Sequence, residues 1–126
     1  MDNLSEFRTH FHKAKSRAKK KKIDFNITLE YLKELWDKQK GICPITGWKM
    51  LNRKNSNTRI KAPFCPERSS LDRIEPNKGY VIGNVRFICL MAQYAKHEFS
   101  DKDLMKFCKT VAKKHANTRF TNRCNI

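Results

Sequence analysis

Ser69-Ser70-Leu71-Asp72-Arg73-Ile74-Glu75-Pro76-Asn77-Lys78-Gly79-Tyr80-Val81-Ile82-Gly83-Asn84-Val85 is the stretch of sequence that decides the fold. It predicts a strand with a buried Asp72, a tight turn, a second strand, and then a helix from Val85 to about His97. Proline fixes φ and glycine accepts a left-handed φ, so the residues 76–79 favour a hairpin connection. Asn84 then falls where the second strand is expected to meet the helix.

The composition predicts one domain, residues 1–126, that binds a polyanion. The chain has 126 residues, of which 39% are apolar, and this suffices for one modest core. Lys and Arg total 28 against 12 Asp and Glu, which gives a net charge of +16. Such an excess favours nucleic acid as the partner. The alternatives are a ribosomal-type or merely basic protein and, less favoured for want of a basic amphipathic face, an anionic membrane surface.

The cysteines indicate the compartment. The chain has five cysteines, an odd number, and no Cys-x-x-Cys pair; they are Cys43, Cys65, Cys89, Cys108 and Cys124. This pattern favours mostly free thiols in a reducing environment. The sequence also shows no apolar run near 18 residues and no signal peptide. We therefore expect an intracellular, cytoplasmic protein.

Three helices are predicted around the central motif. The first is basic and spans residues 1–22, the second follows an N-cap at Thr28 and stops at Gly41, and the third follows Ser100, with Asp103 completing a capping box. Residues 51–64 predict a surface loop and residues 114–126 a frayed tail. The side chains expected to face the core are Leu4, Phe7, Phe11, Ala14 and Ala18, then Leu29, Leu32, Leu35 and Trp36, and finally Leu104, Phe107, Cys108 and Val111.

Basic residues at the end of the first helix and on the central motif are candidates for DNA contacts. Phosphate contacts position a protein on DNA without reading its sequence, so no recognition sequence follows from them. A solvated helix end is the alternative interpretation of the lysine run at 19–22. The candidates are Arg17, Lys19, Lys20, Lys21, Lys22, Arg86 and Lys96.

Asp72, Gln93 and His97 predict a one-metal nuclease site. Phosphodiester hydrolysis of this kind needs a hard divalent cation, a base for the attacking water, and cationic groups that hold the backbone. Asp72 offers a carboxylate, and Gln93 and His97, four residues apart, are expected on one helical face. Water and phosphate oxygens would complete the shell of Mg²⁺, with Mn²⁺ as an alternative. Asp72 could instead be a structural carboxylate paired with Arg73 or Arg86, and His97 an exposed helix residue.

The segments Asp72-Arg73-Ile74, Gly79-Tyr80-Val81-x-Gly83-Asn84-Val85 and Gln93-Tyr94-Ala95-Lys96 resemble the HNH endonuclease motif, also called the His-Me finger or ββα-metal motif. The branch with Ser-Leu-Asp-Arg-Ile on its first strand is most similar, and residues 25–47 add a weaker likeness. The resemblance covers residues 14–108. It implies a small α+β fold with a ββα-metal core, residues 69–98, flanked by helices at both ends.

The resemblance implies a role for each matching residue. Asp72 takes the place of the first metal ligand, and Gln93 that of a His or Asn ligand. Asn84 takes the place of an Asn that pins the loop or orients the base through backbone hydrogen bonds. His97 matches a further His ligand of the colicin-type members.

One departure from the family pattern concerns the general base. The usual base, a His directly after the first ligand, is Arg73 here, and a guanidinium stays protonated at ordinary pH. Arg73 is therefore expected to grip the scissile phosphate or to stabilise charge in the transition state. Tyr80, His97 and a metal-bound hydroxide remain the candidates for the base. Gln93 is a second departure, since its amide oxygen coordinates a metal more weakly than imidazole does.

Another departure concerns structural zinc, which many family members bind through two Cys-x-x-Cys pairs. The matching segments here, Cys43-Pro44-Ile45-Thr46 and Cys89-Leu90-Met91-Ala92, have one cysteine each. Tetrahedral zinc needs four ligands. We therefore expect no structural Zn²⁺ unless Cys65, Cys108 or a His completes the set, and we interpret Cys43 and Cys89 as buried thiols that support the site.

Together these observations predict a metal-dependent DNA endonuclease of restriction or phage and mobile-element type, in a bacterial or phage-infected cell. Double-stranded DNA is the expected partner. A homodimer is compatible with this function, because cutting both strands with one small site usually requires two copies. The alternative is a catalytically silent DNA-binding protein on the same scaffold, which the changes at Arg73 and Gln93 favour. An RNA-binding, ribosome-associated protein would share the charge but not the motif.

Overall fold

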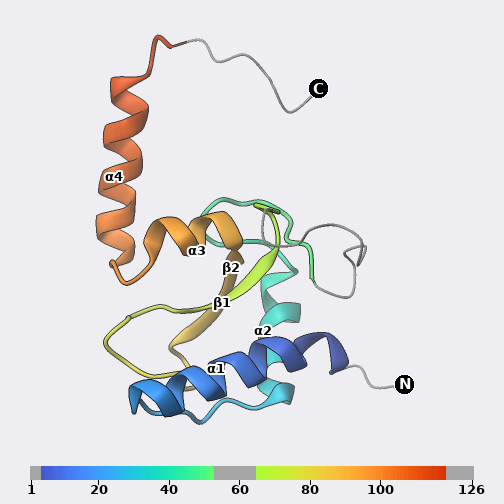
Figure 1. Ribbon diagram of the computed structural model, residues 1–126. Coiled ribbons are helices and arrows are strands. Elements are labelled where there is room, and N and C mark those ends of the chain that lie inside the picture. The colour runs from blue at the N-terminus through green and yellow to red at the C-terminus, as the bar shows by residue number, and fades with distance from the viewer. Residues whose placement is uncertain (1–3, 53–64, 119–126) are drawn as a thin grey trace.

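The structure, a computed structural model, describes residues 4–52 and 65–118. Over these residues the predicted α+β class is confirmed: helices surround a two-stranded antiparallel sheet (Figure 1). No helix in these two ranges is long and apolar enough to cross a membrane. The elements in chain order are η1 (Ser5–Phe7), α1 (Arg8–Lys21), α2 (Leu29–Gln39), β1 (Ser69–Arg73), β2 (Val85–Cys89), α3 (Leu90–Lys96) and α4 (Asp101–Lys114).

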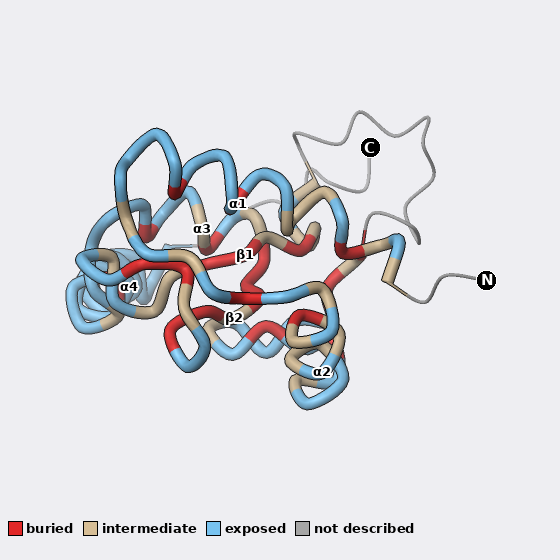
Figure 2. Tube along the Cα trace, turned by 90° about the horizontal axis from the view of Figure 1, so that it is seen from below, coloured by how far each residue is buried: buried red, intermediate tan, exposed pale blue. Residues whose placement is uncertain are grey.

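The β1–β2 hairpin lies between two layers of helix. α1 and α3 lie on one side of it, and α2 lies on the other side, next to β2 (Figure 2). Phe87 of β2 is fully buried, and its ring centroid lies 5.8 Å from that of Phe7 and 5.2 Å from that of Trp36. Aromatic packing of this kind contributes beyond the apolar area it removes from water. The core is therefore centred where β2 meets η1 and α2.

Val85–Cys89 forms the second strand, so the prediction of a helix from Val85 was wrong. The segment is rich in β-branched and aromatic side chains, which fit a buried pleated surface. Gln39 of α2 holds it from the side: the Phe87 amide donates to Gln39 Oε1 at 2.9 Å, and Gln39 Nε2 donates to the Phe87 carbonyl at 2.8 Å. The helix starts only at Leu90, and Asn84 lies at the end of a loop rather than at a strand–helix junction.

The strands are joined by a long loop, residues 74–84, and not by the predicted tight turn. Gly79 does not have a positive φ; among the glycines, Gly41, Gly47 and Gly83 do. Gly79 is required for another reason, because a Cβ atom there would overlap the carbonyl group of Asp24.

The segment after α1 crosses this loop closely. The Tyr80 amide donates to the Asp24 carbonyl at 2.9 Å, and the Asn26 amide donates to the Tyr80 carbonyl at 3.0 Å. Phe25 and Tyr80 thereby form a short parallel bridge. The extended linker at residues 23–27 thus fixes one end of the loop that the site uses.

The predicted helix starts at Thr28 and Ser100 are confirmed. Thr28 accepts a hydrogen bond from the Tyr31 amide at 3.0 Å, and Ser100 accepts one from the Asp103 amide at 3.1 Å. These bonds satisfy amides that a helix leaves without intrahelical partners. The apolar stripes of the first two helices also face the core, with Phe7, Ala14, Ala18 and Leu32 buried and Phe11, Leu29, Leu35 and Trp36 partly buried against them.

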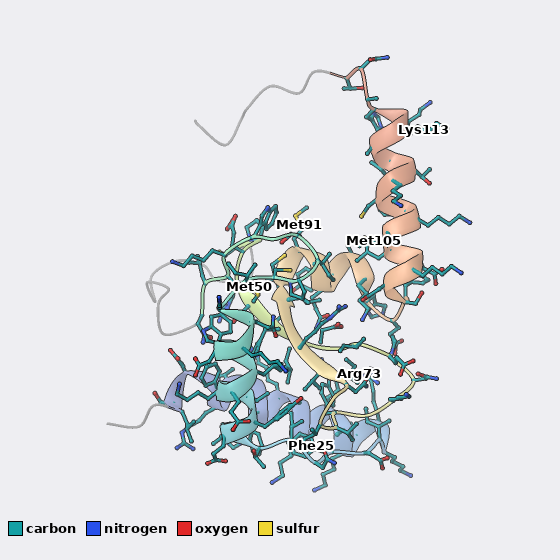
Figure 3. The ribbon with its side chains drawn as sticks, turned by 180° about the vertical axis from the view of Figure 1, so that it is seen from behind. Phe25, Met50, Arg73, Met91, Met105 and Lys113 are labelled. Atoms are coloured by element: carbon teal, nitrogen blue, oxygen red, sulfur yellow. The ribbon has the colours of Figure 1, made fainter. Side chains whose placement is uncertain are left out.

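α4 departs from its predicted packing. Leu104 is buried, but Phe107 is 62% exposed, Val111 is 43% exposed and Cys108 is also exposed. The helix extends away from the rest of the described chain, so most of its side chains project into solvent (Figure 3). An amphipathic pattern predicts that a helix has an apolar face, but not that another element of the same chain covers it.

The predicted surface loop at 51–64 lies mostly outside the described residues, as does most of the predicted tail. Asn52 is an exception and a correction, because it is only 1% exposed. Its Oδ1 accepts a hydrogen bond from the Ser69 hydroxyl at 3.2 Å. Asn52 therefore supports the start of β1 rather than the surface.

Candidate functional site

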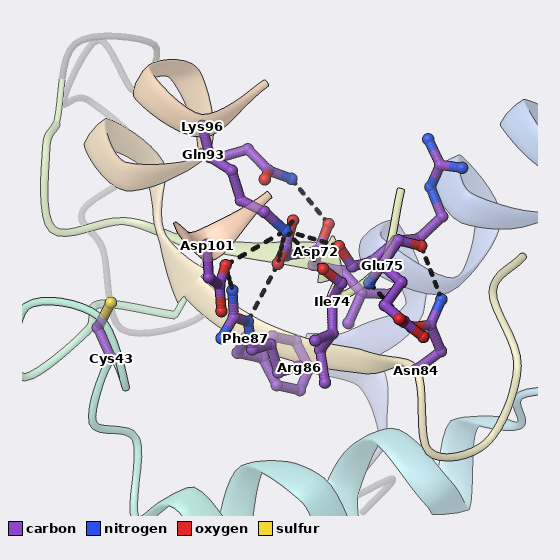
Figure 4. Close-up of polar contacts among 12 residues, drawn as sticks. Cys43, Asp72, Ile74, Glu75, Asn84, Arg86, Phe87, Gln93, Lys96 and Asp101 are labelled. Atoms are coloured by element: carbon purple, nitrogen blue, oxygen red, sulfur yellow. Dashed lines mark hydrogen bonds and ion pairs between the residues drawn. The ribbon is translucent and has the colours of Figure 1, made fainter. Parts of the chain in front are cut away.

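Asp72 is the centre of a buried ion cluster at the C-terminal end of α3 (Figure 4). Its side chain is 4% exposed, and that of Lys96 is fully buried. Lys96 Nζ donates to Asp72 Oδ1 at 3.1 Å and to Oδ2 at 2.9 Å, while Arg86 Nε donates to Oδ2 at 3.0 Å. Arg86 also donates to Asp101 Oδ1 at 2.6 Å. Two carboxylates thus face two cations, and their formal charges cancel.

Arg86 and Asp101 stabilise one another's charge within this cluster. Burial disfavours the charge of Arg86, but its hydrogen bond to Asp101 and the charges of both carboxylates raise the pKa of Arg86 overall. Burial likewise acts to raise the pKa of Asp101, but the hydrogen bond and charge of Arg86 and the charge of Lys96 lower it overall. The Asp101 and Arg86 side chains therefore stay ionised as a pair.

Lys96 also holds the backbone that leaves β1. Its ammonium donates to the carbonyl oxygens of Arg73 at 2.8 Å and Ile74 at 3.2 Å. A fully buried lysine is rare unless its charge is paired. The prediction that Lys96 contacts phosphate is therefore corrected, because Lys96 has no exposed surface. Arg86 is also held in the cluster but its side chain is 14% exposed, and its phosphate contact stays a prediction.

The loop between the strands is fixed by two side chains. Asn84 Oδ1 accepts from the Glu75 amide at 3.0 Å, and Asn84 Nδ2 donates to the carbonyls of Glu75 at 3.2 Å and Gly79 at 2.9 Å. Arg73 Nη1 donates to the carbonyls of Pro76 and Lys78. All of these bonds end on backbone atoms of the loop, so they fix the path of its backbone whatever side chains it carries.

A pocket of about 290 Å³ opens between α1, α3 and this loop. It brings together the side chains that the sequence predicted for the site, apart from Asn84, which holds the loop from behind. Two basic residues of α1 complete the wall. The residues that matter here are Asp72, Arg73, Tyr80, Gln93, His97, Arg17 and Lys21.

Two arginines converge on Tyr80, which is only 3% exposed. Arg17 Nη1 donates to the Tyr80 hydroxyl at 3.2 Å. The Arg73 guanidinium lies 5.4 Å from the centre of the Tyr80 ring, which is the distance range of a cation–π contact. Tyr80 therefore contacts both arginine side chains, and all three residues line the pocket.

Gln93 and His97 reach the pocket differently from one another. Gln93 Nε2 donates to the Leu71 carbonyl at 2.9 Å, which leaves its Oε1 available to a ligand. His97 lies just past the end of α3 with φ 48°, so it does not continue the helical face of Gln93 as predicted. The two side chains nevertheless line the same pocket, and His97 is exposed.

The oxygen atoms of Asp72 and Gln93 that are not fully hydrogen-bonded limit how a divalent cation could bind. A carboxylate oxygen has two lone pairs. Asp72 Oδ2 uses both, for Lys96 and Arg86, whereas Oδ1 accepts only one bond. Asp72 Oδ1 and Gln93 Oε1 thus offer two protein oxygens. Mg²⁺ usually keeps several waters and is bound through one or two carboxylates and substrate phosphates. Asp72 and Glu98 are the described carboxylates that line this pocket, so an ion here would need water and phosphate oxygens as further ligands.

The predicted basic run at the end of α1 divides into two groups. Lys21 lines the pocket and lies 3.6 Å from Glu98 Oε1. Lys19 and Lys22 are exposed at the helix end. Lys20 borders a shallow hollow on the outer side of α1. Only Arg17 and Lys21 of the predicted contacts in this run face the pocket directly.

Cys43 and Cys89 are buried and adjacent, with the Cys89 amide donating to Cys43 Sγ at 3.4 Å. Burial acts to raise the pKa of both thiols. Hydrogen bonds from the Thr46 hydroxyl and from backbone groups outweigh it at Cys43, whose pKa is lowered. At Cys89 burial and the neighbouring Cys43 keep the pKa raised. Both thiols are free, as are those of Cys65 and Cys108, whereas Cys124 lies outside the described residues.

Sequence reasoning missed residues that the structure places next to this pocket. Arg68, Lys13 and Tyr94 line a second hollow that adjoins it. A signal was available for two of them: Tyr94 directly follows Gln93, and Lys13 is four residues from Arg17 on the same helix. Arg68 had only its position before β1 to distinguish it.

A scan against protein-family models, a search of the curated proteins and a search of the solved structures each found no match.

Proposed function

We propose that this chain is a metal-dependent DNA endonuclease, with a ββα-metal core made of β1, the loop 74–84, β2 and α3. The observation that carries the proposal is the pocket in which a carboxylate, an amide, an imidazole and several cations meet. A phosphodiester and its attacking water require this combination of groups. The net charge of +16 supports a polyanionic substrate.

The cations would hold the DNA backbone. Arg17 and Arg73 line the pocket, and the planar guanidinium group of arginine suits phosphate oxygens. Asp72 Oδ1 and Gln93 Oε1 would hold Mg²⁺. The ion, when bound, would polarise the scissile phosphate.

We assign the general base to His97 rather than to Tyr80. Tyr80 is nearly fully buried, and its hydroxyl is held by Arg17. His97 is exposed and lines the pocket, and imidazole is the most frequent general base in enzymes. It would accept a proton from water as the water oxygen bonds to phosphorus. The phosphorus–oxygen ester bond then breaks, and the leaving oxygen takes a proton from solvent.

One observation favours the second candidate, a catalytically silent DNA-binding protein. Asp72 is already neutralised by Lys96 and Arg86, so its carboxylate attracts a cation less than an unpaired one would. A scaffold that no longer bound metal could keep this cluster for stability alone. The two candidates differ in whether removing the carboxylate charge affects cleavage or only folding.

The test is cleavage of supercoiled plasmid with Mg²⁺, with Mn²⁺ and with EDTA. Asp72→Asn is preferable to alanine, because asparagine keeps the shape and an acceptor for Lys96. Asp101→Asn is its matched control, since Asp101 belongs to the same cluster but does not line the pocket. His97→Asn tests the base, because an asparagine amide is polar but does not accept a proton from water as a neutral imidazole can.

We expect metal-dependent cleavage that falls about 100-fold or more in Asp72→Asn and His97→Asn, the range for removing a catalytic group. Asp101→Asn should cut at nearly the wild-type rate. DNA binding in EDTA should remain in all three variants. No cleavage by wild-type protein with any metal, with binding intact, would instead support the silent binding protein.

A further inference from the structure

A second hollow, of about 490 Å³, adjoins the candidate site and extends it into a groove. Its walls are α1 and α3, and its floor is β1 with the residue before it. α1 and α3 lie on the same side of β1 in Figure 2, which is consistent with this arrangement. The two hollows share Arg17, Leu71, Tyr80, Gln93 and Tyr94. A chain lying in the groove would therefore lead directly into the site.

The groove is positively charged. Lys13 and Arg17 project into it from successive turns of α1, and Arg68 faces them from the start of β1. None of the described residues that line it is acidic. This contrasts with the site pocket, where Asp72 and Glu98 are also present. Unmatched cations along a groove are the electrostatic signature of a site for a phosphate backbone.

An exposed aromatic side chain stands where the two hollows meet. Tyr94 is 70% exposed, lines both of them, and packs into no core cluster. A large aromatic ring in that position is not explained by the stability of the fold. Aromatic rings beside a basic groove are the usual platforms on which unpaired bases stack.

The shape of the groove favours single-stranded DNA over a DNA duplex. The groove is concave, with two helices as its walls and a single strand of the sheet as its floor. A DNA duplex is a convex rod, and protein elements insert into its grooves, which are about 12 Å and 6 Å wide. A duplex is therefore not expected to insert into a protein groove of this kind. A single strand, or a nucleotide extruded from a duplex, can enter a hollow of this size.

We propose that the groove between α1 and α3 binds an unpaired DNA strand, with Tyr94 stacked on a base beside the phosphate in the site pocket. This inference rests on the proposed function in one respect, that the bound strand leads to the site of cleavage. It makes DNA with a single-stranded segment, such as a flap, a gap or a fork, the preferred substrate class. Blunt duplex is then the poorer ligand.

The experiment measures binding by fluorescence anisotropy in EDTA, so that no cleavage is needed. Three labelled oligonucleotides of equal length are compared: a single strand, a blunt duplex, and a duplex with an internal gap. The variants are Tyr94→Ala, Tyr94→Phe, and the double variant Lys13→Gln with Arg68→Gln. Met91→Ala controls for Tyr94, because Met91 is 59% exposed on the same helix and lines neither hollow. Lys102→Gln with Lys109→Gln on exposed α4 controls for the loss of two charges.

We expect the single strand and the gapped duplex to bind more tightly than the blunt duplex. Tyr94→Ala should weaken single-strand binding about tenfold, and Tyr94→Phe should retain it, because stacking needs the ring and not the hydroxyl. The Lys13 and Arg68 double variant should reduce the slope of log affinity against log salt by about 1.4, or about 0.7 per phosphate contact on single strands. Both control variants should match the wild type.

Equal or tighter binding of the blunt duplex would overturn the inference, as would wild-type affinity in Tyr94→Ala. These results are separable from those on the proposed function. Strand-selective binding with no cleavage of either the plasmid or the gapped duplex by any metal would leave the groove assignment intact and reject the nuclease. Cleavage of the blunt duplex as fast as of the gapped one would support the nuclease and reject the groove assignment.

Discussion

Charged side chains have opposite roles in the two regions that adjoin α3. In the ion cluster, Lys96 is fully buried against Asp72, and the formal charges of the cluster sum to zero. In the groove between α1 and α3, Lys13 and Arg17 of α1 face a described lining that has no acidic residue. The difference shows that the net charge of the chain does not count its phosphate contacts. Matched and buried charges stabilise the fold, whereas unmatched and accessible ones are left for a ligand.

Removing the buried ammonium should have the largest effect on stability. Lys96→Met keeps the length of the side chain but leaves the Asp72 carboxylate with Arg86 alone and removes the donor to the Arg73 and Ile74 carbonyls. Breaking one partner of a buried pair costs about 3–5 kcal/mol. The free energy of unfolding, measured by urea denaturation, should fall by that amount.

Lys13→Met is the matched control, because it removes the same kind of charge from an exposed position in the groove. It should change the free energy of unfolding by less than about 0.5 kcal/mol while weakening DNA binding. Equal destabilisation by the two lysine variants would contradict the division of charge described above.

The same contrast can be tested with apolar side chains on α4. Leu104 is 4% exposed, whereas Phe107, one turn later on the same face, is 62% exposed. Leu104→Ala should destabilise the protein by about 2–3 kcal/mol. Phe107→Ala should change its stability by less than about 0.5 kcal/mol in dilute solution. A large loss in Phe107→Ala, measured by thermal denaturation, would mean that something covers this face.

Asn84 tests the loop rather than the cluster. Asn84→Ala leaves the Glu75 amide and the buried Gly79 carbonyl without these partners, whereas the Glu75 carbonyl still accepts from the Lys78 amide. We expect a loss of about 2 kcal/mol, since an unsatisfied buried group costs about 1–3 kcal/mol. Asn77→Ala, an exposed change in the same loop, should be nearly neutral. Similar denaturation midpoints for the two variants would show that the Asn84 bonds do not fix the loop.

Local sequence signals were sufficient for part of this structure. The caps at Thr28 and Ser100, the burial of Asp72, and the apolar stripes of α1 and α2 follow from side-chain chemistry within a few residues. The second strand could not be predicted from such local signals, because Val85–Cys89 is held in place by Gln39, a residue far away in the sequence. Periodicity over so short a segment does not separate a strand from a buried helix.

The candidate site shows the same limit. The sequence named the side chains that line the pocket, and it named Arg86 as an alternative partner of Asp72, which the structure bears out. It did not show that Lys96 would be buried, because that burial depends on a carboxylate in β1 and another in α4. Tertiary partners decide whether a lysine is structural or available to a ligand, and no local pattern contains them.

The smallest expected effect is the pH dependence contributed by Asp101. Arg86 from β2 and Lys96 from α3 face this carboxylate and lower its pKa, with Asp72 from β1 beyond them. A carboxyl whose folded pKa is lowered stabilises the protein above its unfolded pKa, about 3.9, and this contribution is lost as pH falls through the folded value. Because the Asp101 side chain is 41% exposed, solvent screening should keep the effect below about 1 kcal/mol.

Urea denaturation of wild type and Asp101→Asn at about pH 6 and about pH 3 measures this contribution. The wild type should be the more stable protein at the higher pH, and the difference should shrink at the lower one. A difference that stays constant would mean that Arg86 and Lys96 do not lower the pKa of Asp101 in the folded protein. The matched charges of the cluster would then be those of Asp72 with Lys96 and Arg86 alone.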